Sequence, residues 1–275
     1  MPILQTRGPA SGPCNICGSI GPLTEDHTPP KGYAPAVPVR FAHIAERLSS
    51  QRRPRDQKAP DGVKYRSLCA RCNNELLGAE YDPALIDMGR QVSALLTSPI
   101  LLPKTMTVRM KPQRVARAVL GHIAAQGVNR YDKGQITVPL SDYIHDPTKP
   151  MPPDLRLCYW LYPHRSRVLM RDAAIMTLFN QGKASMLWLL KSFPLAFAAL
   201  WERDFRFEVP APRDFDAYSS AGVDDVVDLP IDLFNVPPEE WPEAPTDNTM
   251  VMVGKEALTA TISSPRGTIL HARRT

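Results

Sequence analysis

The sequence predicts an α+β fold in which a small N-terminal module, stapled by cysteines, precedes a mixed α/β domain. Three patterns lead to this prediction: paired cysteines near the N-terminus, apolar residues at helical spacing in the middle of the chain, and β-formers with turn residues after residue 135. A hydrophobic content of 43% over 275 residues supplies enough material for buried cores, and the 29 prolines follow no fibrous period. We expect domains at residues 1–100 and 104–235, with a connector and tail at 236–275.

The cysteines of the N-terminal module occur as two CxxC pairs, Cys14-Asn15-Ile16-Cys17 and Cys69-Ala70-Arg71-Cys72. Four thiolates from two such pairs match the tetrahedral site that structural Zn²⁺ prefers. The long separation of the pairs is tolerable because the entropy cost of closing a loop grows only logarithmically with its length. The N-terminus lacks the apolar core of a secretory signal, so we expect a cytoplasmic protein whose cysteines bind metal rather than form disulfides. Cys158 lies in an apolar run and is predicted to fill the core.

The segment between the two cysteine pairs, residues 34–64, is rich in Pro and Arg. We interpret it as a long insertion with one short helix at residues 41–48. After Cys69 the apolar spacing becomes helical, and Pro83 is predicted to separate two helices. A further helix is predicted at residues 112–127, with a proline in its first turn.

The second domain is predicted from runs of β-forming residues, which are QITVPL, LRLCYWLY, SRVLMRDAAIMTLF, SMLWLLKSF and FRFEVP, with a further strand at TMVMVG. The stretch LPIDLFNVPPEEWPEAP is interpreted as an extended connector. Lys191 and Pro194 interrupt the longest apolar run, so we expect no membrane-spanning helix and no membrane partner.

Charge is distributed unevenly along the chain. Ten basic and three acidic residues lie between Lys31 and Arg71, whereas three basic and twelve acidic residues lie between Glu202 and Glu243. A basic face beside the cysteines suits a polyanion, although a solvated Arg-rich loop would give the same count. The expected partner is nucleic acid, with double-stranded DNA preferred, and the sequence is compatible with a homodimer.

Two polar elements beside the cysteine pairs could carry chemistry. The segment LTEDHTPPK places Asp26 next to His27, and adjacent side chains of a strand lie on opposite faces, so that one can hold a metal while the other addresses a water molecule. Asn73 follows the last cysteine near the start of a helix, and its amide oxygen can join Asp26 in holding Mg²⁺. A neutral histidine and a bound cation together meet the needs of phosphodiester hydrolysis.

The order CxxC, LTxDHxPPK and LCxxCN resembles the HNH, or ββα-metal, endonucleases, in the branch with a four-cysteine zinc site. The resemblance covers about residues 12–82 and implies a treble-clef-like module in which a β-hairpin carries the Asp-His pair and a helix brings back the Asn. It implies Asp26 and Asn73 as ligands of a catalytic Mg²⁺ or Mn²⁺, and His27 as the general base. The chain departs from the family pattern because it has no Asn between His27 and Cys69, where the family has an Asn that braces the catalytic loop.

The sequence therefore predicts a metal-dependent HNH endonuclease with His27, Asp26 and Asn73 as catalytic residues. The alternative is a catalytically inactive, zinc-stapled module that binds nucleic acid or protein, which the missing middle Asn favours. His122 lies on the apolar stripe of its helix and is interpreted as a core residue. The side chains predicted to contact phosphates are Lys31, Arg52, Arg53, Arg55, Arg66 and Arg71.

Overall fold

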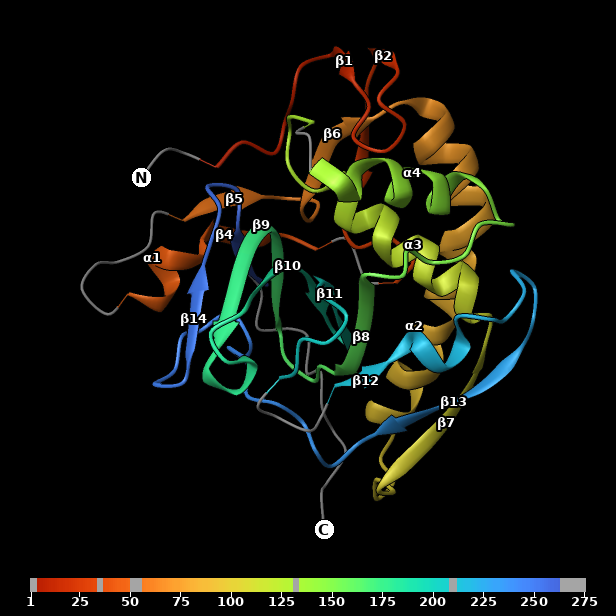
Figure 1. Cartoon of the computed structure of the whole chain (residues 1–275), viewed down its shortest axis with the longest axis vertical. Coiled ribbons are helices and arrows are strands. Elements are labelled where there is room, and N and C mark those ends of the chain that lie inside the picture. Colours follow the sequence, from red (N-terminus) through yellow and green to blue (C-terminus); the bar gives the residue numbers. More distant parts are fainter. Residues whose placement is uncertain (1–3, 34–36, 50–55, 131–133, 208–211, 263–275) are drawn as a thin grey trace.

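The computed structural model of the chain describes residues 4–33, 37–49, 56–130, 134–207 and 212–262 (Figure 1). Its strands are β1 (Ser11–Pro13), β2 (Ile20–Pro22), β3 (Thr24–His27), β4 (Val39–His43), β5 (Gln57–Ala59), β6 (Lys64–Leu68), β7 (Thr105–Met110), β8 (Leu155–Leu161), β9 (Ser166–Thr177), β10 (Ala184–Ser192), β11 (Leu195–Trp201), β12 (Arg213–Asp214), β13 (Val227–Asp232), β14 (Thr249–Met252) and β15 (Leu258–Ile262). Its α-helices are α1 (Ile44–Leu48), α2 (Asp82–Leu96), α3 (Pro112–Ala125) and α4 (Thr137–His145). A π-helix, η1 (Arg71–Tyr81), and three short 3₁₀ turns, η2 (Gly134–Ile136), η3 (Leu178–Asn180) and η4 (Phe215–Tyr218), complete the described elements.

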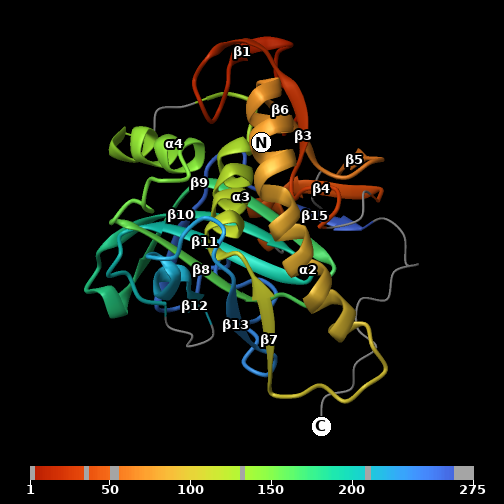
Figure 2. The same ribbon diagram turned by 90° about the vertical axis from the view of Figure 1, so that its right-hand side faces the viewer.

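The N-terminal module joins two strands that are distant in the sequence to one long helical run. β3 pairs antiparallel with β6, so that Asp26 lies opposite Tyr65 and His27 lies opposite Lys64. The helical run of η1 and α2 follows β6 almost at once in the sequence. Figure 2 shows the start of this run beside β3 and β6, near the end of the molecule where β1 lies. The predicted strand for the Asp-His pair is confirmed.

The helical run changes its winding where two separate helices were predicted. The backbone N–H of Asp82 donates to the carbonyl of Leu77, five residues earlier, which is the π-helical pattern. Pro83 lies in the first turn of α2. A proline ring collides with the carbonyl four residues earlier in a regular α-helix, and the wider winding before Pro83 avoids that collision without breaking the run.

A nine-stranded antiparallel sheet dominates the described part of the chain, in the order β12-β8-β11-β10-β9-β15-β4-β5, with β14 also paired to β9. Side chains alternate between two cores on its two faces. Tyr159 and Phe197 belong to the core on the face covered by α3, whereas Cys158 and Ala198 belong to the core on the other face. Burial of both faces explains why the strands appear in the sequence as continuous apolar runs. Cys158 is fully buried, as predicted.

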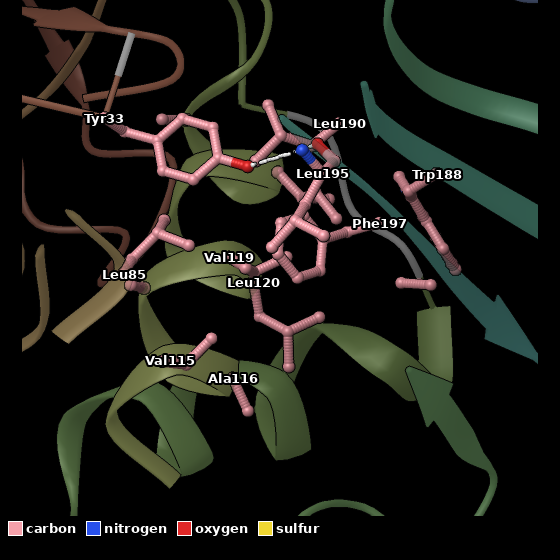
Figure 3. Close-up of a cluster of buried hydrophobic side chains, with 14 of the residues drawn as sticks. Tyr33, Leu85, Val115, Ala116, Val119, Leu120, Trp188, Leu190, Leu195 and Phe197 are labelled. Carbon is pink, nitrogen blue, oxygen red and sulfur yellow. Dashed lines mark hydrogen bonds between the residues drawn. The ribbon is translucent and has the colours of Figure 1, made fainter. Parts of the chain in front are cut away.

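Helix α3 is the predicted helix at residues 112–127, and it connects the sheet to the N-terminal module. Val119 and Leu120 of α3 pack towards Leu190 and Phe197 of the sheet (Figure 3). On its other side α3 approaches η1 so closely that a Cβ atom on Gly121 would lie 2.3 Å from Cδ2 of Leu77. Glycine at this position is therefore required by the close helix packing.

Two predictions of secondary structure are wrong, and a third is only partly covered by the described residues. The QITVPL run forms η2 and the start of α4, because Pro139 cannot donate to a strand ladder but is tolerated in the first turn of a helix. Residues 205–207 of FRFEVP form no strand, and residues 208–210 lie outside the described residues. The predicted helix at residues 41–48 begins only at Ile44, since residues 39–43 form strand β4.

The insertion between the cysteine pairs belongs to the large sheet. Strand β4 pairs with β15, near the C-terminal end of the described chain, and β5 pairs with β4. Part of the expected extended connector also pairs, because β13 forms a two-stranded sheet with β7. The pairing of β4 with β15 joins segments on either side of the boundaries expected at residues 100 and 235, and the basic tail after residue 262 lies outside the described residues. No helix in the described ranges has the length and apolar character needed to cross a membrane.

Candidate metal centre and catalytic site

The four cysteines of the N-terminal module come together from two segments that are distant in the sequence. Cys14 and Cys17 lie in the turn between β1 and β2, and Cys69 and Cys72 lie at the junction of β6 and η1. Their Sγ atoms all lie within 4.8 Å of one another. The module therefore contains a four-cysteine cluster that could hold a metal ion such as zinc.

The geometry of the cluster fits a tetrahedral ion. A tetrahedron with Zn–S bonds of about 2.3 Å has edges of about 3.8 Å between its sulfur atoms. The Sγ atoms of Cys17 and Cys69 lie 3.8 Å apart. A hydrogen bond from the Cys72 thiol lowers the pKa of Cys14 to about 4. Metal binding requires such deprotonation.

The second half of the chain braces the turn that carries the first cysteine pair. Nη1 of Arg130 donates to the carbonyl oxygens of Cys14, Asn15 and Ile16 at 2.8, 3.0 and 2.9 Å. Gly18 ends this turn with φ of 77°, and an added Cβ would lie 3.2 Å from the guanidinium carbon of Arg130. The turn thus depends on glycine both for its backbone conformation and for the approach of the arginine.

A histidine also lies beside the cluster. Nε2 of His145, at the end of α4, lies 3.4 Å from Sγ of Cys72, and its Nδ1–H donates to the carbonyl of Ser141 at 2.8 Å. His145 therefore contacts Cys72, but it is not one of the four residues whose ligand atoms all lie within 4.8 Å of one another.

Asp26 points from β3 into the protein interior. The residue is 6% exposed, and its Oδ2 accepts a hydrogen bond from Nδ1 of His122 at 3.0 Å. Nε2 of His122 donates to Oδ1 of Asp82 at 2.8 Å. Burial by itself would lower the pKa of His122, but the carboxylates of Asp82 and Asp26 outweigh it and raise this pKa to about 10. The histidine is therefore charged and forms a bridge between two buried carboxylates.

His27 lies on the opposite side of β3. Its side chain is 24% exposed, and its Nε2 lies 3.6 Å from Oδ2 of Asp61, which also binds Nζ of Lys64 at 2.5 Å. Burial and the charge of Lys64 lower the pKa of His27 below 6.5, against the opposing effect of Asp61 and Asp26. The imidazole is consequently neutral at pH 7, and among the described residues its buried Nε2 has no hydrogen-bond partner.

A surface cavity of about 380 Å³ lies beside the paired strands β3 and β6. Its lining includes Arg7, Glu25, Lys58, Asp61 and Lys64. Three of these five side chains are basic, so the cavity combines anion-binding groups with the acid that contacts His27.

Asn73 reaches back from the first turn of η1 to β3. Its Nδ2 donates to Oγ1 of Thr24 at 2.9 Å and to the carbonyl of Glu25 at 3.1 Å. Both amide hydrogens are thus used on the two residues that precede Asp26. Within the described part of the chain, Oδ1 of Asn73 and Oδ1 of Asp26 have no hydrogen-bond partner. These are two oxygen atoms of the type that hard divalent cations bind.

The predicted phosphate contacts have different surroundings. Lys31 and Arg71 are exposed, whereas Arg66 is half-buried and forms an ion pair with Glu25 at 3.2 Å. The predicted contacts at residues 52, 53 and 55 lie outside the described residues.

Comparisons of the chain with protein-family models, with curated proteins and with solved structures found no match.

Two residues of the site were not identified from the sequence. His122 was interpreted as a core residue because it lies on an apolar helical stripe, and Asp82 was not among the candidate site residues. No side chain caps α2, and the Asp82 carboxylate accepts a hydrogen bond from His122. A polar residue on an otherwise apolar stripe was the available signal, because a buried histidine needs partners.

Proposed function

We propose that this chain is a metal-dependent endonuclease of the HNH type, which hydrolyses phosphodiester bonds in nucleic acid. The observation that carries the proposal is the double hydrogen bond from Asn73 to β3, on the two residues that immediately precede Asp26 and His27. It joins the acid, the imidazole and the amide in one strand–strand–helix unit beside the cysteine cluster. The unit has the order that the resemblance to HNH endonucleases implies.

The roles follow from the surroundings of each side chain. Neutral His27 would accept a proton from the attacking water, with Asp61 beside its Nε2 to stabilise the imidazolium that results. Oδ1 of Asp26 and Oδ1 of Asn73 would hold Mg²⁺ or Mn²⁺. When bound, the cation neutralises charge on the phosphate oxygens. With zinc bound, as we propose, the cysteine cluster would hold the β1–β2 hairpin and the helix η1 in place.

Double-stranded DNA is the proposed substrate. Lys31 and Arg71 are exposed, and Arg7, Lys58 and Lys64 line the cavity beside the hairpin. Basic side chains of this kind bind phosphates irrespective of base sequence, so binding is expected to weaken steeply as salt is raised.

A cleavage assay with a matched histidine control tests the proposal. Supercoiled plasmid is incubated with Mg²⁺ or Mn²⁺ and with wild-type protein, His27→Ala or His164→Ala. His164 is a suitable control because its side chain is 25% exposed, against 24% for His27, and it also lies near a carboxylate. We expect His164→Ala to keep the wild-type rate and His27→Ala to lose a factor of about 10² to 10⁴. Equal rates for wild type and His27→Ala would refute the proposal.

A second candidate function is a zinc-stapled binding module without catalysis. The burial of Asp26 at 6% exposure and its bond to His122 favour this candidate, because a carboxylate enclosed by protein is less accessible to a cation. It predicts salt-sensitive DNA binding by wild type and His27→Ala alike, with no cleavage product in any divalent metal.

A further inference from the structure

Three buried ionisable side chains from three different elements are joined by two hydrogen bonds. Asp26 comes from β3, His122 from α3 and Asp82 from the start of α2. His122 is completely buried, and Asp26 and Asp82 are 6% and 7% exposed. The two carboxylates belong to the N-terminal module, whereas the imidazole comes from the helix that packs on the large sheet.

The hydrogen bonds fix the orientation of Asp26. Carboxylate oxygens only accept hydrogen bonds here, so both nitrogen atoms of His122 must donate, at 3.0 Å to Asp26 and at 2.8 Å to Asp82. The imidazole cannot turn without breaking both bonds inside the core. Oδ2 of Asp26 is thereby held on His122, and the Asp26 carboxylate cannot rotate freely.

The second oxygen of the Asp26 carboxylate, Oδ1, has no hydrogen-bond partner among the described residues. Of the carboxylate oxygens in this group, it is the one that we assign to a cation, because a carboxylate oxygen is the kind of ligand that hard divalent cations bind.

We propose that His122, held in place by Asp82, is a positioning residue that aims Oδ1 of Asp26 at a divalent cation. This inference rests on the cation site of the proposed function but does not depend on cleavage. Partners that orient a metal ligand typically change metal affinity 10- to 100-fold when they are removed. A purely structural ion network would change stability and leave metal affinity alone.

The test is Mn²⁺ binding to the full-length protein, followed by the electron paramagnetic resonance signal of free Mn²⁺, with zinc added to saturate the cysteine cluster. His122→Ala removes a buried side chain and can unfold the protein, so Asp82→Leu, which is close in size and removes the acceptor for Nε2 of His122, is the principal variant. The matched control is Glu243→Gln, because Glu243 is 3% exposed and pairs with Lys191, a residue outside the proposed site. Thermal unfolding is measured for every variant.

We expect one Mn²⁺ site in wild type, its loss in Asp26→Asn, and a 10- to 100-fold weaker affinity in Asp82→Leu. Glu243→Gln should lower thermal stability and keep the wild-type affinity. An Asp82→Leu protein that is folded and binds Mn²⁺ within twofold of wild type would overturn the inference, as would a wild type that binds no Mn²⁺. Normal Mn²⁺ binding without plasmid cleavage would instead reject the endonuclease and leave the positioning role standing.

Discussion

Replacement of Tyr33 by Phe tests whether the N-terminal module and the large sheet form one cooperative unit. Tyr33 is 8% exposed, and its hydroxyl donates to the carbonyl of Leu195 and accepts from the N–H of Leu195, both at 3.2 Å (Figure 3). Its ring packs so closely on α2 that a Cβ on Gly89 would lie 2.6 Å from two ring carbons. Phe keeps this packing and removes only the two hydrogen bonds.

The expected loss follows from the groups left behind. A typical hydrogen bond contributes about 1 kcal/mol, and a buried peptide group left without a partner costs about 1 to 3 kcal/mol, so we expect Tyr33→Phe to lower the free energy of unfolding by about 2 kcal/mol. For a chain of 275 residues the corresponding fall in Tm is about 3 to 4 °C. The assay is urea unfolding followed by circular dichroism and by tryptophan fluorescence.

Tyr218→Phe is the matched control for this experiment. Tyr218 is half-buried, and its hydroxyl has no partner within the residues that the structure describes. The control should stay within about 0.5 kcal/mol of wild type, in the range of substitutions that break no specific contact. A Tyr33→Phe protein as stable as the control would show that the link from residue 33 to β11 contributes no stability.

Three further predictions concern the metal cluster, the helix packing and the response to alkali. Strong chelators or Cys72→Ser should expose the N-terminal module to limited proteolysis, because binding of a structural ion is coupled to folding; an unchanged cleavage pattern would contradict this. Gly121→Ala should cost about 1 to 3 kcal/mol, since its Cβ overlaps Leu77, and adding Leu77→Ala should cost less in this background than in wild type, as measured by a double-mutant cycle. Burial raises the pKa of Tyr33 and Tyr65 above 10, so as the pH rises these side chains ionise first in the unfolded chain. Each tyrosine should leave the free energy of unfolding unchanged below pH 10 and lower it by about 1.4 kcal/mol per pH unit above pH 10. Equal free energies of urea unfolding at pH 9 and pH 11 would refute this prediction.

Local patterns predicted the parts of the site that depend on nearby residues. The two CxxC pairs predicted the four-cysteine cluster, because each pair is a short turn that supplies two sulfur ligands and a structural zinc ion takes four. The alternation of a strand predicted that Asp26 and His27 would point to opposite sides of β3. Asn73 was placed near the hairpin from its position after Cys72 at the start of a helix.

Contacts between distant segments were not predictable in the same way. Strand β4 pairs with β15, more than 200 residues later, and no local periodicity encodes that partner. His122 is similar, because its helical stripe shows that it is buried but not that Asp26 and Asp82 receive its two N–H groups. The QITVPL run, which forms η2 and the start of α4, was wrongly predicted as a strand because its branched residues suit a strand while the position of Pro139 suits a first helical turn.

The measurement that tests the central claim most directly is chemical rescue of His27→Gly by free imidazole in the Mg²⁺-dependent plasmid assay. If the side chain of His27 supplies the proton acceptor, imidazole should restore cleavage in proportion to its concentration, and it should not restore cleavage to Asp26→Asn, which keeps its histidine. A wild-type rate no greater than that of His27→Gly, with or without imidazole, would contradict the account.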